Sequence, residues 1–163
     1  MSYREIPGFV DEQSAFGETT VTVEPARIRD ACLHARDELG FQMLVDIVAT
    51  DYLNWGGRGV SGYIATASGR DLNFPSTQGL QTLPEVKARR FSVAYHLLAL
   101  RQPPVRLRLK CWLDDGEPVP SVVGVFPCAD YQEREAWDLM GIDFSDHPHL
   151  ERIFLPEGWD GSA

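Results

Sequence analysis

Four side chains near the C-terminus are of types that bind metal ions. Asp143 and Asp146 stand close to His147 and His149, and imidazole and carboxylate groups are common ligands of zinc and iron. Pro148 biases His147 toward an extended backbone, in which side chains two residues apart can still converge. Short His-Pro loops nevertheless more often form capped turns. We therefore expect a structural turn held partly by His147, with no metal.

Two other groups of residues have types that could suggest catalysis. Glu133 and Glu135 lie about 200° apart if they are on a helix, so their carboxylates do not converge on one bond as glycosidase carboxylates must. Cys32, Cys111 and Cys128 are scattered and form no Cys-x-x-Cys pair, which argues against a disulfide framework, an iron–sulfur cluster or a structural zinc site. We expect buried thiols and no catalysis by this chain alone.

A glycine-rich stretch, GRGVSG at residues 57–62, matches the Gly-x-Gly-x-x-Gly pattern of dinucleotide-binding turns. That pattern binds a pyrophosphate only when it opens a helix whose N–H groups face the phosphate. The residues that follow, YIATAS at 63–68, favour a strand and are followed by Gly69. The sequence predicts a turn between two strands here.

A helix before the His-Pro loop has clear end signals. Asp130 has the type of an N-cap residue, Glu133 is placed to reach back to the cap N–H, and Gly141 is suited to end the helix.

The predicted helix has one apolar and one charged face. Its apolar face comprises Ala136, Leu139 and Met140, and its charged face comprises Arg134, Glu135 and Asp138. Trp137 falls at the border of the charged face, next to Glu133. Aromatic and Arg side chains set together are typical of interface hot spots, whereas exposed charges alone are usually only solvated. The residues by themselves leave a docking face and an ordinary helix surface both open.

The elements that must position this helix have simple patterns. Residues 1–20 have few periodic apolar positions, so we expect order to begin near residue 19 with a short strand around 20–23. Apolar positions at helical spacing predict a helix from Pro25 to Gly40. The apolar run 44–49 predicts a strand covered on both faces rather than a short buried helix.

Two more strands and a long connection follow. Residues 91–98 are typical of a strand, and residues 105–113 alternate between apolar side chains and a cationic set, which predicts one buried and one cationic face. Residues 68–90 show no sustained period and are interpreted as a surface excursion. We expect the C-terminal third to be helical.

Composition limits the function classes. The chain has 163 residues, 44% of them hydrophobic, and a net charge of −9, which fits one soluble domain and disfavours nucleic acid and anionic membranes as partners. No apolar run is long enough to span a membrane, and the start of the chain lacks the pattern of a secretory signal. We expect the chain to stay in the cytosol.

The C-terminal third carries a family resemblance. Residues 119–161, with their Glu-Arg-Glu, Trp-Asp, Gly-Ile and His-Pro pieces, resemble the signature region of the C-type subunit of respiratory complex I, NADH:quinone oxidoreductase. Segments 41–53, 89–100 and 105–113 follow the order that this family shows. The chain departs from the pattern at Glu151, where the family usually has a basic residue.

The resemblance implies an α+β fold: a two-layer domain with a mixed β-sheet and helices packed on one side. It suggests an N-terminal extension at residues 1–18, the domain at 19–141 and a C-terminal segment at 142–163. It also implies a peripheral position on the cytoplasmic side of the inner membrane. NADH, FMN, iron–sulfur clusters and quinone are then expected in other subunits, with no cofactor in this chain.

The resemblance further implies a docking role against the D-type quinone-site subunit, near the B-type and I-type subunits. The partner-binding residues expected from it are Glu133, Arg134, Glu135, Trp137, Asp138, His147 and Arg152. An equivalent docking subunit of a membrane-bound hydrogenase or formate hydrogenlyase complex is the alternative.

Overall fold

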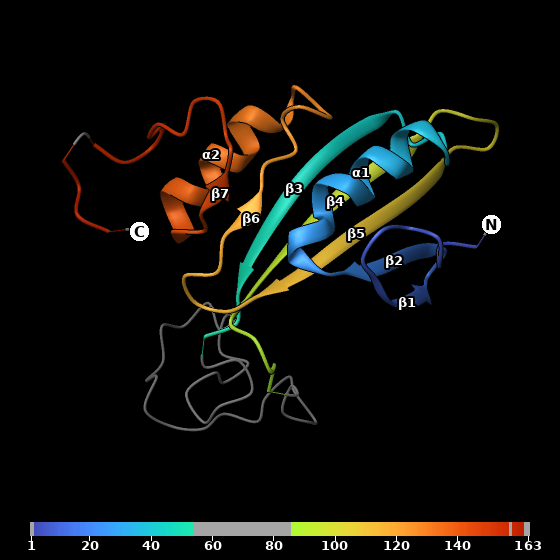
Figure 1. Ribbon diagram of the computed structural model, residues 1–163, viewed down its shortest axis with the longest axis horizontal. Coiled ribbons are helices and arrows are strands. Elements are labelled where there is room, and N and C mark those ends of the chain that lie inside the picture. The colour runs from blue at the N-terminus through green and yellow to red at the C-terminus, as the bar shows by residue number, and fades with distance from the viewer. Residues whose placement is uncertain (1, 54–85, 157, 162–163) are drawn as a thin grey trace, which may run out of the picture.

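The computed structural model describes residues 2–53, 86–156 and 158–161, and its centre is a five-stranded sheet (Figure 1). The strands are β1 (Phe9–Ala15), β2 (Glu18–Val23), β3 (Met43–Asp51), β4 (Phe91–Ala99) and β5 (Val105–Leu113). Their spatial order is β1-β2-β5-β4-β3. β2 and β5 are parallel and the other neighbours are antiparallel. The predicted α+β fold with a mixed sheet is confirmed.

One helix covers a face of this sheet. The short 3-10 helix η1 (Pro25–Arg27) leads into α1 (Ile28–Asp37), which lies in front of the sheet in Figure 1 and runs roughly along β4 and β5. Ile28, Ala31, Cys32 and Ala35 are buried because their spacing places them on one side of the helix. Gly40 adopts a left-handed backbone after the helix, as its position predicted.

Strand β3 was correctly predicted to be a strand, but the predicted burial of both its faces is wrong. Leu44 and Ile47 are buried, whereas Val45 and Val48 are 49% and 40% exposed. The prediction of cover on both faces is wrong because the helices occupy only one side of the sheet and β3 forms its edge. Strands β4 and β5 are confirmed, and β5 has the predicted buried face at Leu107 and Leu109.

The N-terminal residues form part of the fold. β1 pairs antiparallel with β2 through a two-residue turn at Phe16 and Gly17, and Tyr3 and Ile6 are buried in the core. The expectation that order begins near residue 19 is therefore wrong. Six of the seven β1 side chains are exposed, so the strand is held in place by its backbone hydrogen bonds to β2. A pattern of apolar side chains does not reveal such pairing.

The C-terminal third is only partly helical. It contains α2 (Ala129–Met140) and two short parallel strands, β6 (Val119–Pro120) and β7 (Phe144–Ser145). α2 ends at Gly141 in a left-handed conformation, as predicted. The predicted N-terminal cap is wrong: Cys128 occupies that position and its side chain does not cap the helix, and Asp130 lies inside the first turn.

Candidate functional site

Glu133 turns from α2 into the protein interior. Its side chain is fully buried, and Oε1 accepts a hydrogen bond from the backbone N–H of Val122 at 2.7 Å. The prediction that it reaches back to the helix cap is therefore wrong. Burial raises the pKa of the Glu133 carboxyl to about 7, although hydrogen bonds from Ser121 and Val122 and the charge of Arg29 act in the opposite direction. Glu133 joins α2 to the segment that follows β6.

His147 holds the turn after β7. Its side chain is fully buried, and its Nδ1 accepts the backbone N–H of His149 at 3.0 Å. A neutral ring therefore carries its proton on Nε2, which lies 3.3 Å from the carbonyl oxygen of Asp130 and 3.8 Å from Oε2 of Glu133. The predicted structural turn held by His147 is confirmed.

Asp138 also turns inward. Its Oδ2 accepts three backbone N–H groups, from Ile153, Phe154 and Leu155, at 2.7 to 3.1 Å, and its Oδ1 lies 2.8 Å from Nη1 of Arg152. Burial alone pushes the pKa of Asp138 upward, but these four donors outweigh it and hold the pKa well below its ordinary value. Asp138 thus fastens the C-terminal segment to α2.

Three of the predicted partner-binding residues are therefore not on the surface. Glu133 and Asp138 have no exposed area, and neither does the His147 side chain. The prediction that Asp138 lies on an outward charged face is wrong because the folded-back C-terminal segment covers that side of α2. A partner protein cannot reach these side chains directly, so they act by positioning others.

The remaining predicted residues reach the surface. Glu135 is exposed, and Arg134, Trp137 and Arg152 are partly buried. The Arg134 guanidinium lies 5.3 Å from the ring centroid of Tyr131, and the Arg152 guanidinium lies 5.4 Å from that of Trp137. Each arginine is thus held against an aromatic ring.

The C-terminal segment adds aromatic side chains that sequence reasoning missed. Phe154 is 61% exposed and Trp159 is 49% exposed, and Tyr131 on α2 is 66% exposed. Arg152 donates to the carbonyl oxygens of Trp159 and Gly161, at 2.8 and 3.0 Å, within this segment, and its pair with Asp138 ties the segment to α2. We name the set the aromatic–arginine surface; it comprises Tyr131, Arg134, Trp137, Arg152, Phe154 and Trp159. The aromatic residues Phe154 and Trp159 are visible in the sequence and could have been used to predict this surface.

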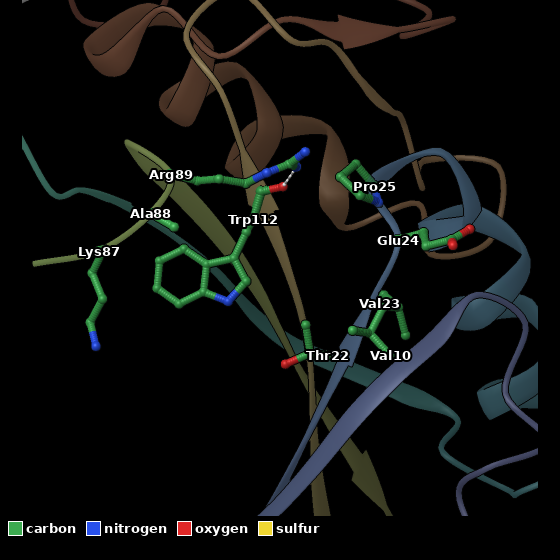
Figure 2. Close-up of a pocket in the computed structure, with 9 residues that line it drawn as sticks. All are labelled: Val10, Thr22, Val23, Glu24, Pro25, Lys87, Ala88, Arg89 and Trp112. Carbon is green, nitrogen blue, oxygen red and sulfur yellow. Dashed lines mark hydrogen bonds between the residues drawn. The ribbon is translucent and has the colours of Figure 1, made fainter.

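A mostly apolar pocket of about 390 Å³ lies where β2 and β5 meet residues 87–89, with the Trp112 indole on one wall (Figure 2). Among its charged residues, Arg89 already bonds the Trp112 carbonyl oxygen at 2.6 Å and lies 3.2 Å from Glu117. Its described lining contains no Ser, Cys or His, and its other polar side chains are those of Thr22, Glu24 and Lys87.

The glycine-rich stretch, the predicted surface excursion and the three cysteines were also assigned from the sequence. GRGVSG at 57–62 lies outside the described residues, as does most of the predicted excursion at 68–90. Cys32 and Cys111 are buried as predicted, and burial raises the pKa of both thiols, that of Cys111 to about 12. The prediction is wrong for Cys128, which is exposed because it stands at the start of α2 rather than on its packed face.

Two of the four side chains considered as metal ligands, Asp146 and His147, pair with other protein groups. Asp146 lies 3.1 Å from Nη2 of Arg29, and His147 faces Asp130. In the part of the chain that the structure describes, no three His, Cys, Asp or Glu side chains are grouped so as to hold a metal ion. None of the described helices has the length and apolarity needed to span a bilayer.

Comparison with known proteins identifies relatives over most of the chain. The C-type subunit of NADH-quinone oxidoreductase from Vesicomyosocius okutanii subsp. Calyptogena okutanii is 38% identical over 158 residues, which cover 96% of this chain and 74% of the relative. The corresponding subunits from Methylobacterium sp. (strain 4-46) and Halorhodospira halophila are each 37% identical. The matches cover 93% and 89% of this chain but only 56% and 64% of these two relatives.

Solved structures share the fold. Nqo5, as a trypsin-resistant fragment, has a TM-score of 0.63 at 25% identity, covering 88% of this chain and 90% of the fragment. A chain of an archaeal membrane-bound sulfane sulfur reductase also has a TM-score of 0.63, at 16% identity, covering 94% of this chain and 72% of its own length. The family model for the 30 Kd subunit of respiratory-chain NADH dehydrogenase matches residues 21–163. This protein therefore belongs to the family of the 30 Kd subunit of respiratory-chain NADH dehydrogenase.

Proposed function

We propose that the chain is a non-catalytic docking subunit in the peripheral arm of a proton-translocating NADH:quinone oxidoreductase. The aromatic–arginine surface carries this proposal. Its three most exposed rings, Tyr131, Phe154 and Trp159, would be costly to leave in water, and arginines beside aromatic rings are enriched at interface hot spots. The relatives are named as subunits of NADH-quinone oxidoreductase, and the choice of this complex in the proposal rests on those names.

The partners that we propose are the D-type quinone-site subunit, with B-type and I-type iron–sulfur subunits nearby. Arg134, Trp137 and Arg152 contribute directly from the aromatic–arginine surface, and the exposed Glu135 stands on the same helix. Glu133, Asp138 and His147 contribute indirectly, because they hold α2, the turn and the C-terminal segment in one arrangement. This division of roles narrows the set expected from the sequence to its accessible members.

We propose that no cofactor is bound by this chain and that NADH, FMN, iron–sulfur clusters and quinone are held by other subunits. An iron–sulfur cluster is usually held by about four thiolate ligands. The chain has three cysteines, and the buried Cys32 and Cys111 have raised pKa values that disfavour the thiolate. The complex would be placed on the cytoplasmic side of the inner membrane, with this chain peripheral.

Alanine substitution of the exposed rings tests the docking role. Tyr131→Ala and Trp159→Ala are expected to reduce assembly of the peripheral arm in native membranes, because loss of a hot-spot aromatic typically costs about 2 kcal/mol or more, roughly 30-fold in affinity. Phe16→Ala is the matched control, since Phe16 is a fully exposed ring on the hairpin between β1 and β2. Native gels and NADH:quinone activity of the membranes report assembly, and normal assembly of both variants would refute the proposal.

An equivalent subunit of a membrane-bound hydrogenase or formate hydrogenlyase complex is the second candidate. The shared fold with a chain of the sulfane sulfur reductase shows that this architecture occurs in another respiratory membrane complex. The identities of 37–38% to NADH-quinone oxidoreductase subunits favour the first candidate. Identification of the subunits that co-purify with the chain decides between them.

A further inference from the structure

The outer edge of β3 has no strand beside it in the described part of the chain. β3 stands last in the sheet order, next to β4 on one side only. An edge strand presents backbone N–H and C=O groups that pair readily with another extended segment. In Figure 1, α2 lies alongside this strand, on the side away from β4. The edge therefore borders a helix without being covered by a strand.

Backbone contacts show which part of this edge is already used. The carbonyl oxygens of Leu44 and Val45 lie 3.7 Å from the Cys128 thiol and 3.4 Å from Nε2 of Gln132, respectively, so the first part of the edge is capped by α2. The Ile47 N–H donates to the carboxylate of Asp46 at 2.9 Å. The edge at Leu44 and Val45 is thus capped from α2, whereas the Ile47 N–H bonds only the side chain of the preceding residue.

The edge from Ile47 onward is available for pairing. In an antiparallel ladder, residues alternate between bonding the neighbouring strand and turning both backbone groups away from it. The Ile47 N–H bonds a side chain, which indicates that Ile47 belongs to the outward set, and the alternation then adds Ala49. Among the described residues, Asp46 is the only one whose side chain hydrogen-bonds a backbone group of β3 between Ile47 and Ala49. Its carboxylate is exposed and can rotate away from the Ile47 N–H. Ile47 and Ala49 can therefore pair with an incoming strand.

A groove of about 330 Å³ runs between this edge and α2. Residues 46–49 of β3 line one side, and Gln132, Glu135, Ala136, Leu139 and Met140 of α2 line the other. Because Gln132 Nε2 is directed at the Val45 carbonyl oxygen, Oε1 of the same amide is left buried with no hydrogen-bond partner among the described residues. An unsatisfied buried acceptor is unfavourable, and a backbone N–H entering the groove would satisfy it.

The charges and apolar side chains of the groove specify its occupant. Asp46 and Glu135 are exposed acids on its opposite sides, and its described lining contains no Lys or Arg. Leu139 and Met140 are only partly buried and offer apolar contact. A segment with alternating basic and apolar side chains is complementary to both features, since alternate residues of a strand point in opposite directions.

We propose that the β3–α2 groove receives an extended segment of a partner subunit, with alternating basic and apolar side chains, which adds a strand to the edge of β3 at Ile47 and Ala49. The inference rests on the proposed docking function but uses a different surface from the aromatic–arginine surface. Each incoming strand residue that pairs would exchange backbone hydrogen bonds with the edge, and one N–H would satisfy Gln132 Oε1.

Amide hydrogen exchange on the full chain, free and within the complex purified from native membranes, tests the pairing directly. The Ile47 and Ala49 amides are expected to exchange at least ~10-fold more slowly in the complex. Amides of the outer edge of β1, at the far side of the sheet, serve as the reference for general protection. Unchanged exchange at both Ile47 and Ala49 would overturn the proposal. Protection that rises with concentration of the free chain would also overturn it, since it indicates pairing with a second copy.

A proline substitution tests the role of the edge in assembly. Ala49→Pro removes an outward N–H, and proline is tolerated at such positions of edge strands. Ala49→Val is the matched control, because it adds bulk and keeps the N–H. We expect Ala49→Pro to lower recovery of partner subunits about 10-fold relative to Ala49→Val at equal cellular levels of the chain.

The result separates this inference from the docking function. If Ala49→Pro assembles normally while Tyr131→Ala or Trp159→Ala does not, the proposed strand addition at the β3–α2 groove is refuted and the proposed docking function is supported. If the wild-type chain itself recovers no partner subunits, both the groove proposal and the docking function are refuted. Should Ala49→Pro unfold the isolated chain, the hydrogen exchange of the wild-type protein decides.

Discussion

The Asp138 carboxylate and the Arg152 guanidinium form an ion pair with an Oδ1–Nη1 distance of 2.8 Å, between α2 and the C-terminal segment. The side chain of Asp138 is fully buried and that of Arg152 is 22% exposed. Arg152 also lies over the Trp137 ring. One pair thereby places an aromatic side chain of the helix beside the segment that carries Phe154 and Trp159.

Removing the carboxylate should release this segment. Asp138→Ala leaves the backbone N–H groups of Ile153, Phe154 and Leu155 without their acceptor, so we expect a fall of several degrees in the thermal midpoint and faster proteolysis after residue 150. Glu135→Ala is the matched control, because Glu135 is an exposed acid on the same helix. Equal proteolysis of the two variants would contradict the assigned role of Asp138.

The acid limit of stability should reflect the same carboxylate. The pKa of Asp138 is lowered in the folded protein, so its contribution is present above the pKa of the unfolded chain, near 3.8, and is lost as the pH falls below that value. Unfolding of the wild type and of Asp138→Ala at pH 6 and pH 3 is expected to show a smaller difference at pH 3. A difference that grows toward low pH would contradict the assignment.

Glu133 should act in the opposite direction across a higher pH range. Its pKa is about 7 in the folded protein and about 4.5 in the unfolded chain, so the folded state binds the proton more tightly and stability falls as the pH rises between these values. The loss amounts to about 3 kcal/mol at most. Glu133→Gln is expected to lack this fall. Urea unfolding from pH 5 to pH 8 measures it, and parallel profiles of the two proteins would contradict the raised pKa.

Arg29 should contribute more to stability than Arg27, two residues earlier. Arg29 on α1 donates through Nε to the Ser121 carbonyl oxygen at 2.8 Å and lies 3.1 Å from Asp146, which joins α1 to the β6–β7 region. Arg27 forms an ion pair with Asp30 in which both side chains are half exposed. We expect Arg29→Met to cost about 1–2 kcal/mol and Arg27→Met less than about 0.5 kcal/mol in chemical denaturation. Equal losses would argue against the bridge.

Phe16 should be replaceable with a gain in stability. It has a φ of 53° in the turn between β1 and β2, is fully exposed, and precedes Gly17, which has a φ of 80°. A left-handed backbone is unfavourable for Phe, whereas Asn-Gly is preferred in such hairpin turns. Phe16→Asn is expected to stabilise the isolated chain by about 0.5–1 kcal/mol. A loss of stability would show that the ring makes a contact in the folded chain.

Local pattern in the sequence determined the elements whose burial is periodic. The helix after Pro25, strands β4 and β5, and the end of α2 at Gly141 follow from side-chain spacing and from a glycine suited to a left-handed backbone. The family also followed from the sequence, because the motif pieces after residue 119 are specific in order and spacing. Neither inference requires knowledge of which distant residues come into contact.

Only the tertiary structure decided which charged residues of α2 face inward. Glu133 and Asp138 are both buried, yet their partners are Val122, 11 residues earlier, and Ile153–Leu155, 15 to 17 residues later. Burial of a carboxylate depends on whether distant donors satisfy it, and helical periodicity carries no information about those donors. Strand β1 was missed for the same reason, since it is held by backbone pairing to β2 with little burial of its own side chains.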